Sequence, residues 1–320
     1  TIDFRTESNS AVFLSVHPDQ DSLSFTGSSA NYNLETNLLK VEGVPFIQSA
    51  DAFIYPKEGL VEVEADARMK RLEEARIIAD VENKYHTINK TNIQIKGKNE
   101  YIATGGLYEY NVGEHDQEIE FSKIEVLKTR KGPNRGKLVT TGLGSVKVQD
   151  NFLLDEKTFF QGRATLRANQ KELEFNGFAK INSPVMSDST WFSIDNAVDR
   201  NNVILEYTEP RNLVGQKLKT GIFIKRDTGL IYSRVLTAPY SRRDRAIFET
   251  NGVIKYVEGG TNSSDGSIIP DYFLMGDSAR VLAGSKRGNS MKFERVSGNL
   301  TYEGSFTFAD KLPYVKVTVA

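Results

Sequence analysis

The chain has 320 residues and a formal net charge of −1, from 41 basic and 42 acidic side chains. This balance provides no overall attraction to nucleic acid or to an anionic membrane. Hydrophobic residues at 39% and charged residues at 26% are typical of a folded soluble protein. No apolar run reaches the roughly 18 residues that a membrane-spanning helix needs.

The chain contains no cysteine, which excludes disulfides, thiolate metal sites and cysteine nucleophiles. The lack of thiols also fits a protein exported to the periplasm or the surface of a bacterium, so we expect an extracytoplasmic location. The sequence starts at Thr1 without a methionine and stops within a strand-like segment at Ala320. We therefore interpret it as a segment of a larger protein.

Short strands are predicted from the beginning of the chain. Residues 23–30 contain an aromatic-x-Gly step, and residues 87–97 are rich in alternating β-branched side chains. Residues 67–83 are ambiguous, because their apolar positions lie loosely at helical spacing among strong helix formers. The similarity of 71–80 to 87–97 favours a strand, and one short helix near 67–83 is the alternative.

Two basic stretches, 128–137 and 240–246, are candidate binding sites. The first has glycine, proline and no apolar residue, so we predict an exposed loop. Cationic side chains on such loops can hold an acidic polysaccharide, a lipid phosphate or an acidic partner, although a charge run is more often a solvated surface. The candidate residues are Lys128, Arg130, Lys131, Arg135 and Lys137, together with Arg242, Arg243 and Arg245.

The segment 158–182 contains the pattern Phe-x-Gly-x-Ala-x-aliphatic twice, first from Phe160 and then from Phe175. Both copies alternate with the period of a half-buried strand. We interpret the repeat as a packing module, in which an aromatic ring covers a glycine in stacked strands. Phe178 interrupts the polar face of the second copy. It is a candidate for contact with a sugar ring or a partner, and packing beneath a loop is the other interpretation.

Regular short strands and 25 glycines predict an all-β protein with an elongated repeat architecture, such as a β-jellyroll or a solenoid of stacked strands. The spacing of the pattern changes near residue 185. We therefore predict a stacked β-repeat region over 1–185 and a second β-rich region over 186–320.

The stretch FQGRATLRANQKELEFNGFAKI, which begins at Phe160, resembles the stacked strand repeats of the OstA/LptA-like β-jellyroll proteins of bacterial envelopes. Residues 41–88 resemble segments of large uncharacterised envelope or surface proteins of Bacteroidota. The likeness covers residues 20–182 and rests on pattern, so no functional residue carries over. It implies an extracytoplasmic, non-enzymatic role in scaffolding or in handling an amphipathic envelope molecule.

The three histidines lie far apart and form no metal-binding pair, and we predict no cofactor. His86, at a strand entry, is expected to form hydrogen bonds. The loops 17–22 and 195–202 gather oxygen ligands without the spacing of an EF-hand, which leaves a structural calcium ion and an ordinary polar turn as alternatives.

Catalytic residues are not predicted. Asp51 and Asp271 have apolar neighbours, and we interpret both as turn or cap residues rather than as a glycosidase pair. The adjacent Ser285 and Lys286 lie in a turn-like stretch and match no nucleophile motif.

Two functions follow as hypotheses. The leading one is a non-enzymatic binding or scaffold segment of a bacterial envelope or surface protein. Its partner would be an envelope protein, an acidic glycan or a lipid head group, contacted through sheet edges or basic loops. The alternative is a carbohydrate-active enzyme or glycan-binding module on a β scaffold.

Overall fold

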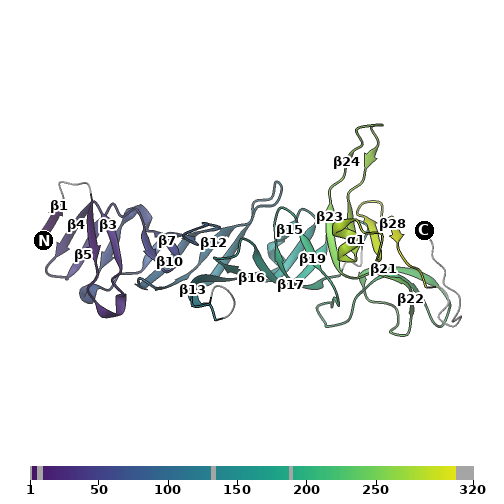
Figure 1. Cartoon of the computed structure of the whole chain (residues 1–320), viewed down its shortest axis with the longest axis horizontal. Coiled ribbons are helices and arrows are strands. Elements are labelled where there is room, and N and C mark those ends of the chain that lie inside the picture. Colours follow the sequence, from purple (N-terminus) through teal and green to yellow (C-terminus); the bar gives the residue numbers. More distant parts are fainter. Residues whose placement is uncertain (1, 6–9, 131–134, 187–189, 308–320) are drawn as a thin grey trace. The chain divides into compact units, whose positions relative to one another are not determined.

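The computed structural model describes residues 2–5, 10–130, 135–186 and 190–307. Antiparallel strands dominate its regular structure, which confirms the predicted all-β class (Figure 1). The chain divides into two compact units, and each is described by itself. Unit 1 comprises Thr1–Asn111, Asp116–Val146 and Arg163–Leu173, and unit 2 comprises Val112–His115, Lys147–Gly162 and Glu174–Ala320. The boundary near residue 185 stays a prediction.

Unit 1 contains two antiparallel sheets. The strand order is β1-β4-β5-β8 in the smaller sheet. The larger sheet runs β16-β14-β13-β11-β10-β9-β7-β6-β3-β2, where β12 pairs with β10 and β13 and where the second half of β16 (Thr158–Arg167) belongs to unit 1. The strands are β1 (Ile2–Arg5), β2 (Ala11–Leu14), β3 (Ser24–Gly27), β4 (Ser29–Asn33), β5 (Leu38–Glu42), β6 (Ile47–Ser49), β7 (Ala52–Tyr55), β8 (Val61–Val63), β9 (Leu72–Ala79), β10 (His86–Gly97), β11 (Glu100–Thr104), β12 (Gly106–Glu109), β13 (Glu118–Lys128) and β14 (Leu138–Val146). Short 3₁₀ turns occupy Pro18–Gln20, Lys57–Gly59 and Ala65–Ala67.

Strand β9 decides the ambiguity over residues 67–83, and the helical alternative is wrong. Leu72, Ala75 and Ile77 are buried and pair across β10. The step of three between Leu72 and Ala75 arises because the register shifts there and Glu74 adopts a φ of 49°. A bulge inserts one extra residue into a strand, so it can imitate the spacing of a helix.

Two buried polar clusters lie in unit 1. Asp51, in the turn between β6 and β7, accepts hydrogen bonds from the Thr140 N–H at 2.8 Å and the Thr140 hydroxyl at 2.6 Å. Burial raises the pKa of the Asp51 carboxyl. The side chain of His86 is fully buried, and its Nε2 lies 2.6 Å from the carbonyl oxygen of Gln170. Its Nε2 therefore donates to that carbonyl, while Nδ1 accepts from the Tyr108 hydroxyl at 3.2 Å.

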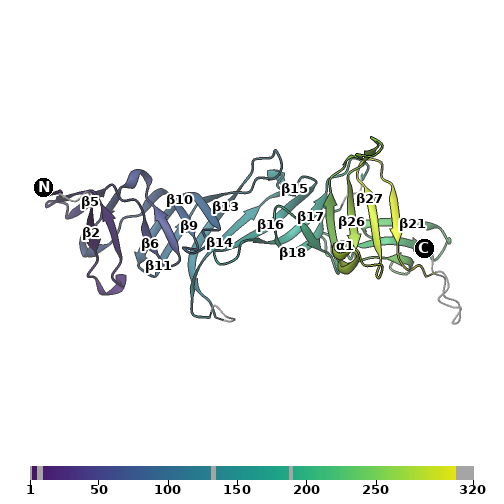
Figure 2. The same ribbon diagram turned by 45° about the horizontal axis from the view of Figure 1, so that its top comes forward.

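Unit 2 contains several small sheets (Figure 2). The run β18-β17-β16, with β15 beside β16, belongs to the sheet in which β16 also pairs with β14, and the separate sheets are β19-β23-β26-β27-β28, β21-β20-β22 and β24-β25. The strands are β15 (Leu153–Asp155), β16 (Thr158–Arg167), β17 (Leu173–Ile181), β18 (Phe192–Val198), β19 (Ile204–Glu206), β20 (Lys219–Ile224), β21 (Ile231–Thr237), β22 (Arg245–Glu249), β23 (Val253–Val257), β24 (Gly260–Thr261), β25 (Ile268–Ile269), β26 (Tyr272–Gly276), β27 (Ser290–Glu294) and β28 (Leu300–Glu303), and a 3₁₀ turn spans Val148–Asp150. Strand β16 ends, and β17 begins, with residues assigned to unit 1.

The packing predicted for the repeated motif is confirmed. The rings of Phe160 and Phe175 meet edge to face with their centroids 5.1 Å apart. A Cβ atom on Gly177 would lie 2.3 Å from the Gln161 carbonyl oxygen and 2.7 Å from Gly162 Cα. The two glycines therefore allow β16 and β17 to approach closely beneath the aromatic pair.

The sequence patterns miss one helix. Helix α1 (Ser278–Ala283) begins after the cap Asp277, whose carboxylate accepts the Ala279 N–H at 3.0 Å, and ends at Gly284 with a φ of 65°. Six residues are too few to establish a helical period. None of the helices in the described ranges has the length and apolar character required to cross a membrane.

Candidate functional site: a charged groove in unit 2

The first basic stretch connects β13 and β14 in unit 1. Its stem is closed by hydrogen bonds from the Thr129 N–H to the Lys137 carbonyl and from the Gly136 N–H to the Thr129 carbonyl, both of 2.8 Å. The candidate residues Lys128, Arg130, Arg135 and Lys137 are all exposed, as predicted for a loop, and Lys131 lies outside the described residues. The described residues of this stretch therefore present their charge to solvent on a hairpin.

The second basic stretch precedes β22 in unit 2. Arg242 and Arg243 lie in an exposed turn that is held by Asp244, which accepts the Tyr232 hydroxyl at 2.6 Å and the Ser241 N–H at 2.9 Å. The bond from Tyr232 lowers the pKa of Asp244. Arg245 is the exposed first residue of β22. The turn therefore displays arginine side chains from a fixed backbone.

Phe178 and Arg242 line the two ends of a series of hollows in unit 2, which we call the groove. Its first hollow has a volume of about 460 Å³, its middle hollow about 190 Å³ and its third about 560 Å³. Glu209 and Pro210 line both the first and the middle hollow, while Lys217 lines both the middle and the third. The structure thus connects two candidates that are far apart in sequence.

Charge is distributed unevenly along the groove. The charged residues that line the first hollow are all acidic: Asp195, Glu206 and Glu209. The third hollow has four basic residues, Arg211, Lys217, Lys219 and Arg242, against Asp244 and Glu249. The groove therefore has an acidic end beside Phe178 and a mainly basic end beside Arg242.

Two ion pairs cross the middle of the groove. Lys217 Nζ lies 3.2 Å from Glu209 Oε1, and Lys219 pairs with Glu249. The hydrogen bond and charge of Lys217 lower the pKa of the Glu209 carboxyl. The hairpin that carries Lys217 is closed by Asn212, whose side-chain oxygen accepts the N–H groups of Val214 at 3.1 Å and Gln216 at 2.8 Å. The turn closed by Asn212 therefore fixes the position of Lys217.

Tyr207 forms part of the wall of the first and middle hollows. Only 2% of this residue is exposed, and its hydroxyl forms no hydrogen bond within the described part of the chain. Burial raises the pKa of the phenol, and the nearby Thr250 hydroxyl lowers it by a smaller amount. An unpaired buried hydroxyl is a polar group that a ligand or a water molecule can satisfy.

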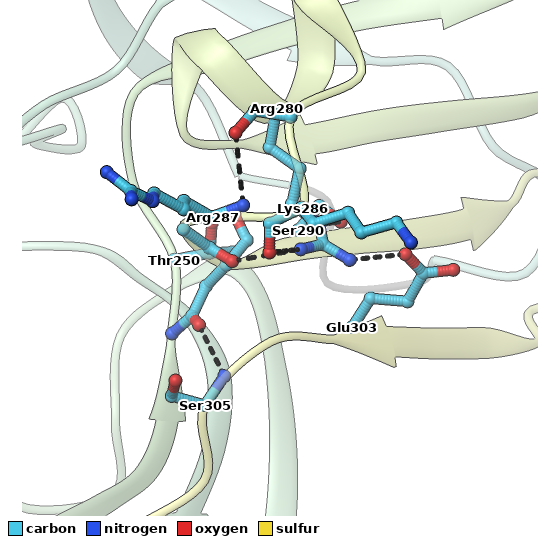
Figure 3. A network of polar contacts seen from close by, with 10 residues as sticks. Thr250, Arg280, Lys286, Arg287, Ser290, Glu303 and Ser305 are labelled. Carbon is cyan, nitrogen blue, oxygen red and sulfur yellow. Dashed lines mark hydrogen bonds and ion pairs between the residues drawn. The ribbon is translucent and has the colours of Figure 1, made fainter. Parts of the chain in front are cut away.

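A polar network that includes Thr250 holds the end of β22, and Glu249 and Thr250 line the middle hollow (Figure 3). Asn289 donates to the Glu249 carbonyl at 2.8 Å, and its backbone carbonyl accepts the Thr250 hydroxyl at 3.1 Å. Arg280 orders the same loop by donating to the Lys286 carbonyl at 2.9 Å and to Ser290 Oγ at 2.9 Å, and it pairs with Glu303 at 2.5 Å. Two wall residues of the groove are therefore rigidly placed.

An aromatic and cationic cluster lies beside the basic end. The rings of Tyr232 and Tyr240 have centroids 4.7 Å apart, and the Arg234 guanidinium lies 4.0 Å from the Tyr240 centroid. Tyr240 is 62% exposed and directly follows Pro239, which lines the third hollow. Such a ring offers a face for stacking.

The remaining polar candidates have structural partners. Asp51 is held by Thr140, as described above, and Asp271 pairs with Arg295. Ser285 Oγ accepts the Arg287 N–H at 3.0 Å, and His86 forms the predicted hydrogen bonds.

In each of the two oxygen-rich loops a carboxylate accepts a hydrogen bond, from a distant asparagine in the first loop and within the turn in the second. Asn99 donates to Asp21 at 3.0 Å, and the Asn201 N–H donates to Asp199 at 3.0 Å. Within the described residues, no group of three or more histidine, aspartate or glutamate side chains is arranged to hold a metal ion.

Sequence reasoning missed most of the groove. Its wall comes from β17, β18, the segment 206–220 and β22, so no single window contains it. A local signal lies in TEPRNLVGQKLK at 208–219, where Glu209 is followed by the basic residues Arg211, Lys217 and Lys219 around a turn that begins at Asn212. No protein-family model matches this sequence, and neither a curated protein nor a solved structure matches it.

Proposed function

We propose that the chain is a non-enzymatic binding segment of a bacterial cell-envelope or surface protein, and that the groove binds an extended segment of an envelope protein. The observation that carries the proposal is the separation of charge between the two ends of the groove. A polypeptide can present basic and acidic side chains at a fixed spacing, so complementary charge selects one orientation of the bound segment. The absence of cysteine and the resemblance to envelope proteins support the extracytoplasmic setting.

The ionisation of Glu209 supports recognition rather than proton donation by this residue. A general acid in a glycosidase needs a carboxyl whose pKa is raised towards the working pH. The pKa of Glu209 is instead lowered by Lys217, so this carboxylate keeps its charge. A permanently charged ion pair can recognise a partner but is poorly suited to donating a proton.

Glycan binding is the second candidate, and Tyr240 favours it. Its exposed ring lies against Arg234 and close in sequence to Arg242 and Arg243. An aromatic face can stack on a sugar ring while an arginine holds a carboxylate or phosphate group. The acidic first hollow would repel an acidic glycan, so this candidate uses only the basic end of the groove.

The test is affinity capture from the solubilised envelope of the source bacterium. The matched variant is Glu209→Lys/Lys217→Glu, which keeps an ion pair but reverses its polarity within the groove. Val148→Ser, at an exposed site elsewhere in unit 2, is the control. We expect one or more envelope proteins to be retained by the wild type and the control, and depleted at least ~10-fold by the reversed pair, about 1.4 kcal/mol of binding free energy.

Two results would overturn the protein-binding proposal. Equal retention by the reversed pair would show that the groove is not the binding site. Retention of glycan alone, abolished by Tyr240→Ala, would establish the second candidate instead. A further variant, Arg135→Gln/Lys137→Gln, tests whether the first basic stretch contributes.

A further inference from the structure

Two loops meet at one end of the three-stranded sheet β21-β20-β22 in unit 2. Residues 225–230 join β20 to β21, and residues 240–244 lead into β22. Both neighbours run antiparallel to β20, so the end of β20 and the starts of β21 and β22 lie at the same end of the sheet. We call residues 225–231 and 240–245 the loop end.

The two loops are held together by Asp244. Its carboxylate accepts the Arg226 N–H at 3.4 Å, the Ser241 N–H at 2.9 Å and the Tyr232 hydroxyl at 2.6 Å. The Tyr240 N–H donates to the same Tyr232 hydroxyl at 3.3 Å. These bonds join one loop to the other, so the loop end forms a single surface.

This surface is basic, although the whole chain is nearly neutral. Arg226, Arg242 and Arg243 are exposed, and their guanidinium groups form no ion pair within the described part of the chain. The carboxylate of Asp244 is already occupied by the bonds described above. Three cations are therefore available to an anionic partner. The loop end as a whole contains the basic residues Lys225, Arg226, Arg242, Arg243 and Arg245 and the acidic residues Asp227 and Asp244.

Apolar side chains project from the same surface. Leu230 is 57% exposed, Ile231 is 58% exposed and Tyr240 is 62% exposed. The Lys225 N–H donates to the Leu230 carbonyl at 2.9 Å, and the Lys225 ammonium lies 5.5 Å from the centroid of the Tyr240 ring. Two aliphatic side chains and an aromatic ring are thus exposed on the two loops that carry the arginines.

The apolar residues distinguish an anionic lipid surface from other acidic partners. Arginine binds phosphate and carboxylate groups wherever they occur, so the basic residues alone do not choose between a lipid, an acidic glycan and a nucleic acid. A chain of sugars and phosphates offers no apolar region for Leu230 and Ile231 to enter. The boundary between lipid head groups and acyl chains offers both kinds of contact, and tyrosine rings are enriched there.

We propose that the loop end docks on an anionic lipid surface. Arg226, Arg242 and Arg243 contact lipid phosphates, while the apolar side chains of the loop end enter the boundary with the acyl chains. Arg242 also lines the third hollow, so the lipid surface lies at the basic end of the groove. The inference does not rest on the ligand proposed for the groove.

Co-sedimentation with lipid vesicles tests the docking. The vesicles contain equal parts of phosphatidylglycerol and phosphatidylcholine, and vesicles of phosphatidylcholine alone are the neutral reference. We expect the wild type to bind the mixed vesicles at least ~10-fold more tightly than the neutral ones, because each cation gains affinity near an anionic surface. Arg226→Gln/Arg243→Gln should lower the affinity for mixed vesicles at least ~10-fold, and Leu230→Ser/Ile231→Ser by at least ~5-fold.

Each variant has a matched control. Lys286→Gln/Arg287→Gln removes the same charge from the loop between α1 and β27, where Asn289 binds Thr250 just beyond the opposite end of β22 (Figure 3). Val148→Ser replaces an exposed apolar residue elsewhere in unit 2. Both controls should bind as the wild type does. None of the substituted residues lines the groove, so the result is separate from that of the groove variants.

A fluorescent label tests the insertion, since the chain has no native cysteine. A polarity-sensitive dye on Leu230→Cys should shift its emission to shorter wavelength when mixed vesicles are added, while the same dye on Val148→Cys should not. A wild type that binds neither vesicle, or binds both equally, would overturn the proposal. The same conclusion would follow from an equal loss in the charge control, or from a dye at residue 230 that stays in water.

Discussion

Unit 1 and unit 2 use polar residues in different ways. In unit 1 the principal polar clusters are buried, with Asp51 and His86 bonded inside a regular antiparallel ladder. In unit 2 the Lys217–Glu209 pair of the groove lies at the surface and outside the strands, while Lys219 and Glu249 pair between the ends of β20 and β22. Buried polar groups fix a fold because leaving one unpaired is costly, whereas exposed pairs contribute little stability and stay available to a ligand.

The largest expected effect on stability comes from disturbing the close approach of β16 and β17 in unit 2. Gly177→Ala places a methyl group against the Gln161 carbonyl and Gly162 Cα. Such overpacking costs about 1–3 kcal/mol, and more where backbone atoms must move. Urea unfolding should show this loss, while Gly260→Ala, which meets nothing within 4 Å and has no positive φ, should change stability by less than about 0.5 kcal/mol. Equal effects of the two variants would contradict the packing account.

The next effect concerns the Asp51 cluster in unit 1. Asp51→Ala leaves the N–H and hydroxyl of Thr140 without their acceptor, which should lower the free energy of unfolding by about 1–3 kcal/mol. Asp51→Asn keeps one acceptor oxygen and should retain most of that stability. Denaturant titration of both variants makes the comparison, and similar losses would show that the negative charge, rather than the hydrogen bonds, matters.

A smaller effect depends on pH and on His86. Burial lowers the pKa of its imidazole in the folded state, so the unfolded state binds the proton more tightly. The contribution of His86 to stability is therefore present above its unfolded pKa of about 6.5 and is lost as the pH falls below that value. The free energy of unfolding, measured from pH 8 to pH 5, should fall more in the wild type than in His86→Gln, which has no imidazole to protonate. Parallel pH profiles would refute it.

The smallest expected effect on stability is in the groove. Reversing the exposed pair with Glu209→Lys/Lys217→Glu should change the free energy of unfolding by no more than about 1 kcal/mol. Thermal unfolding of the variant checks this point. A larger loss would mean that the pair supports the fold, and would remove the contrast between the two units.

The sequence predicts the all-β class and the repeated motif well, because alternation and the Phe-x-Gly step report directly on strand packing. The similarity of 71–80 to 87–97 favoured a strand, and β9 is one. The bulge at Glu74 explains why a helix stayed open as the alternative, since one inserted residue turns a strand period into a helix-like one. Asp277 and Gly284 marked the two ends of α1, but the helix between them was too short to show a period. The basic residues were found by composition alone.

The groove could be predicted only at its ends. Phe178 was noticed because it breaks an alternation, and Arg242 because it belongs to a charged run. The acidic wall and the Lys217–Glu209 pair depend on which turns fold against which strands. Such long-range placement carries no local signature in a single sequence.

Selection from a library of random displayed peptides tests the central claim most directly, because it works without an identified partner. The library would be selected on the wild type and rescreened on Glu209→Lys/Lys217→Glu. The account predicts enriched peptides with basic residues at one end and acidic residues at the other, in a constant order, and loss of their binding to the reversed pair. Enriched peptides without this charge order, or with equal binding to both proteins, would contradict it.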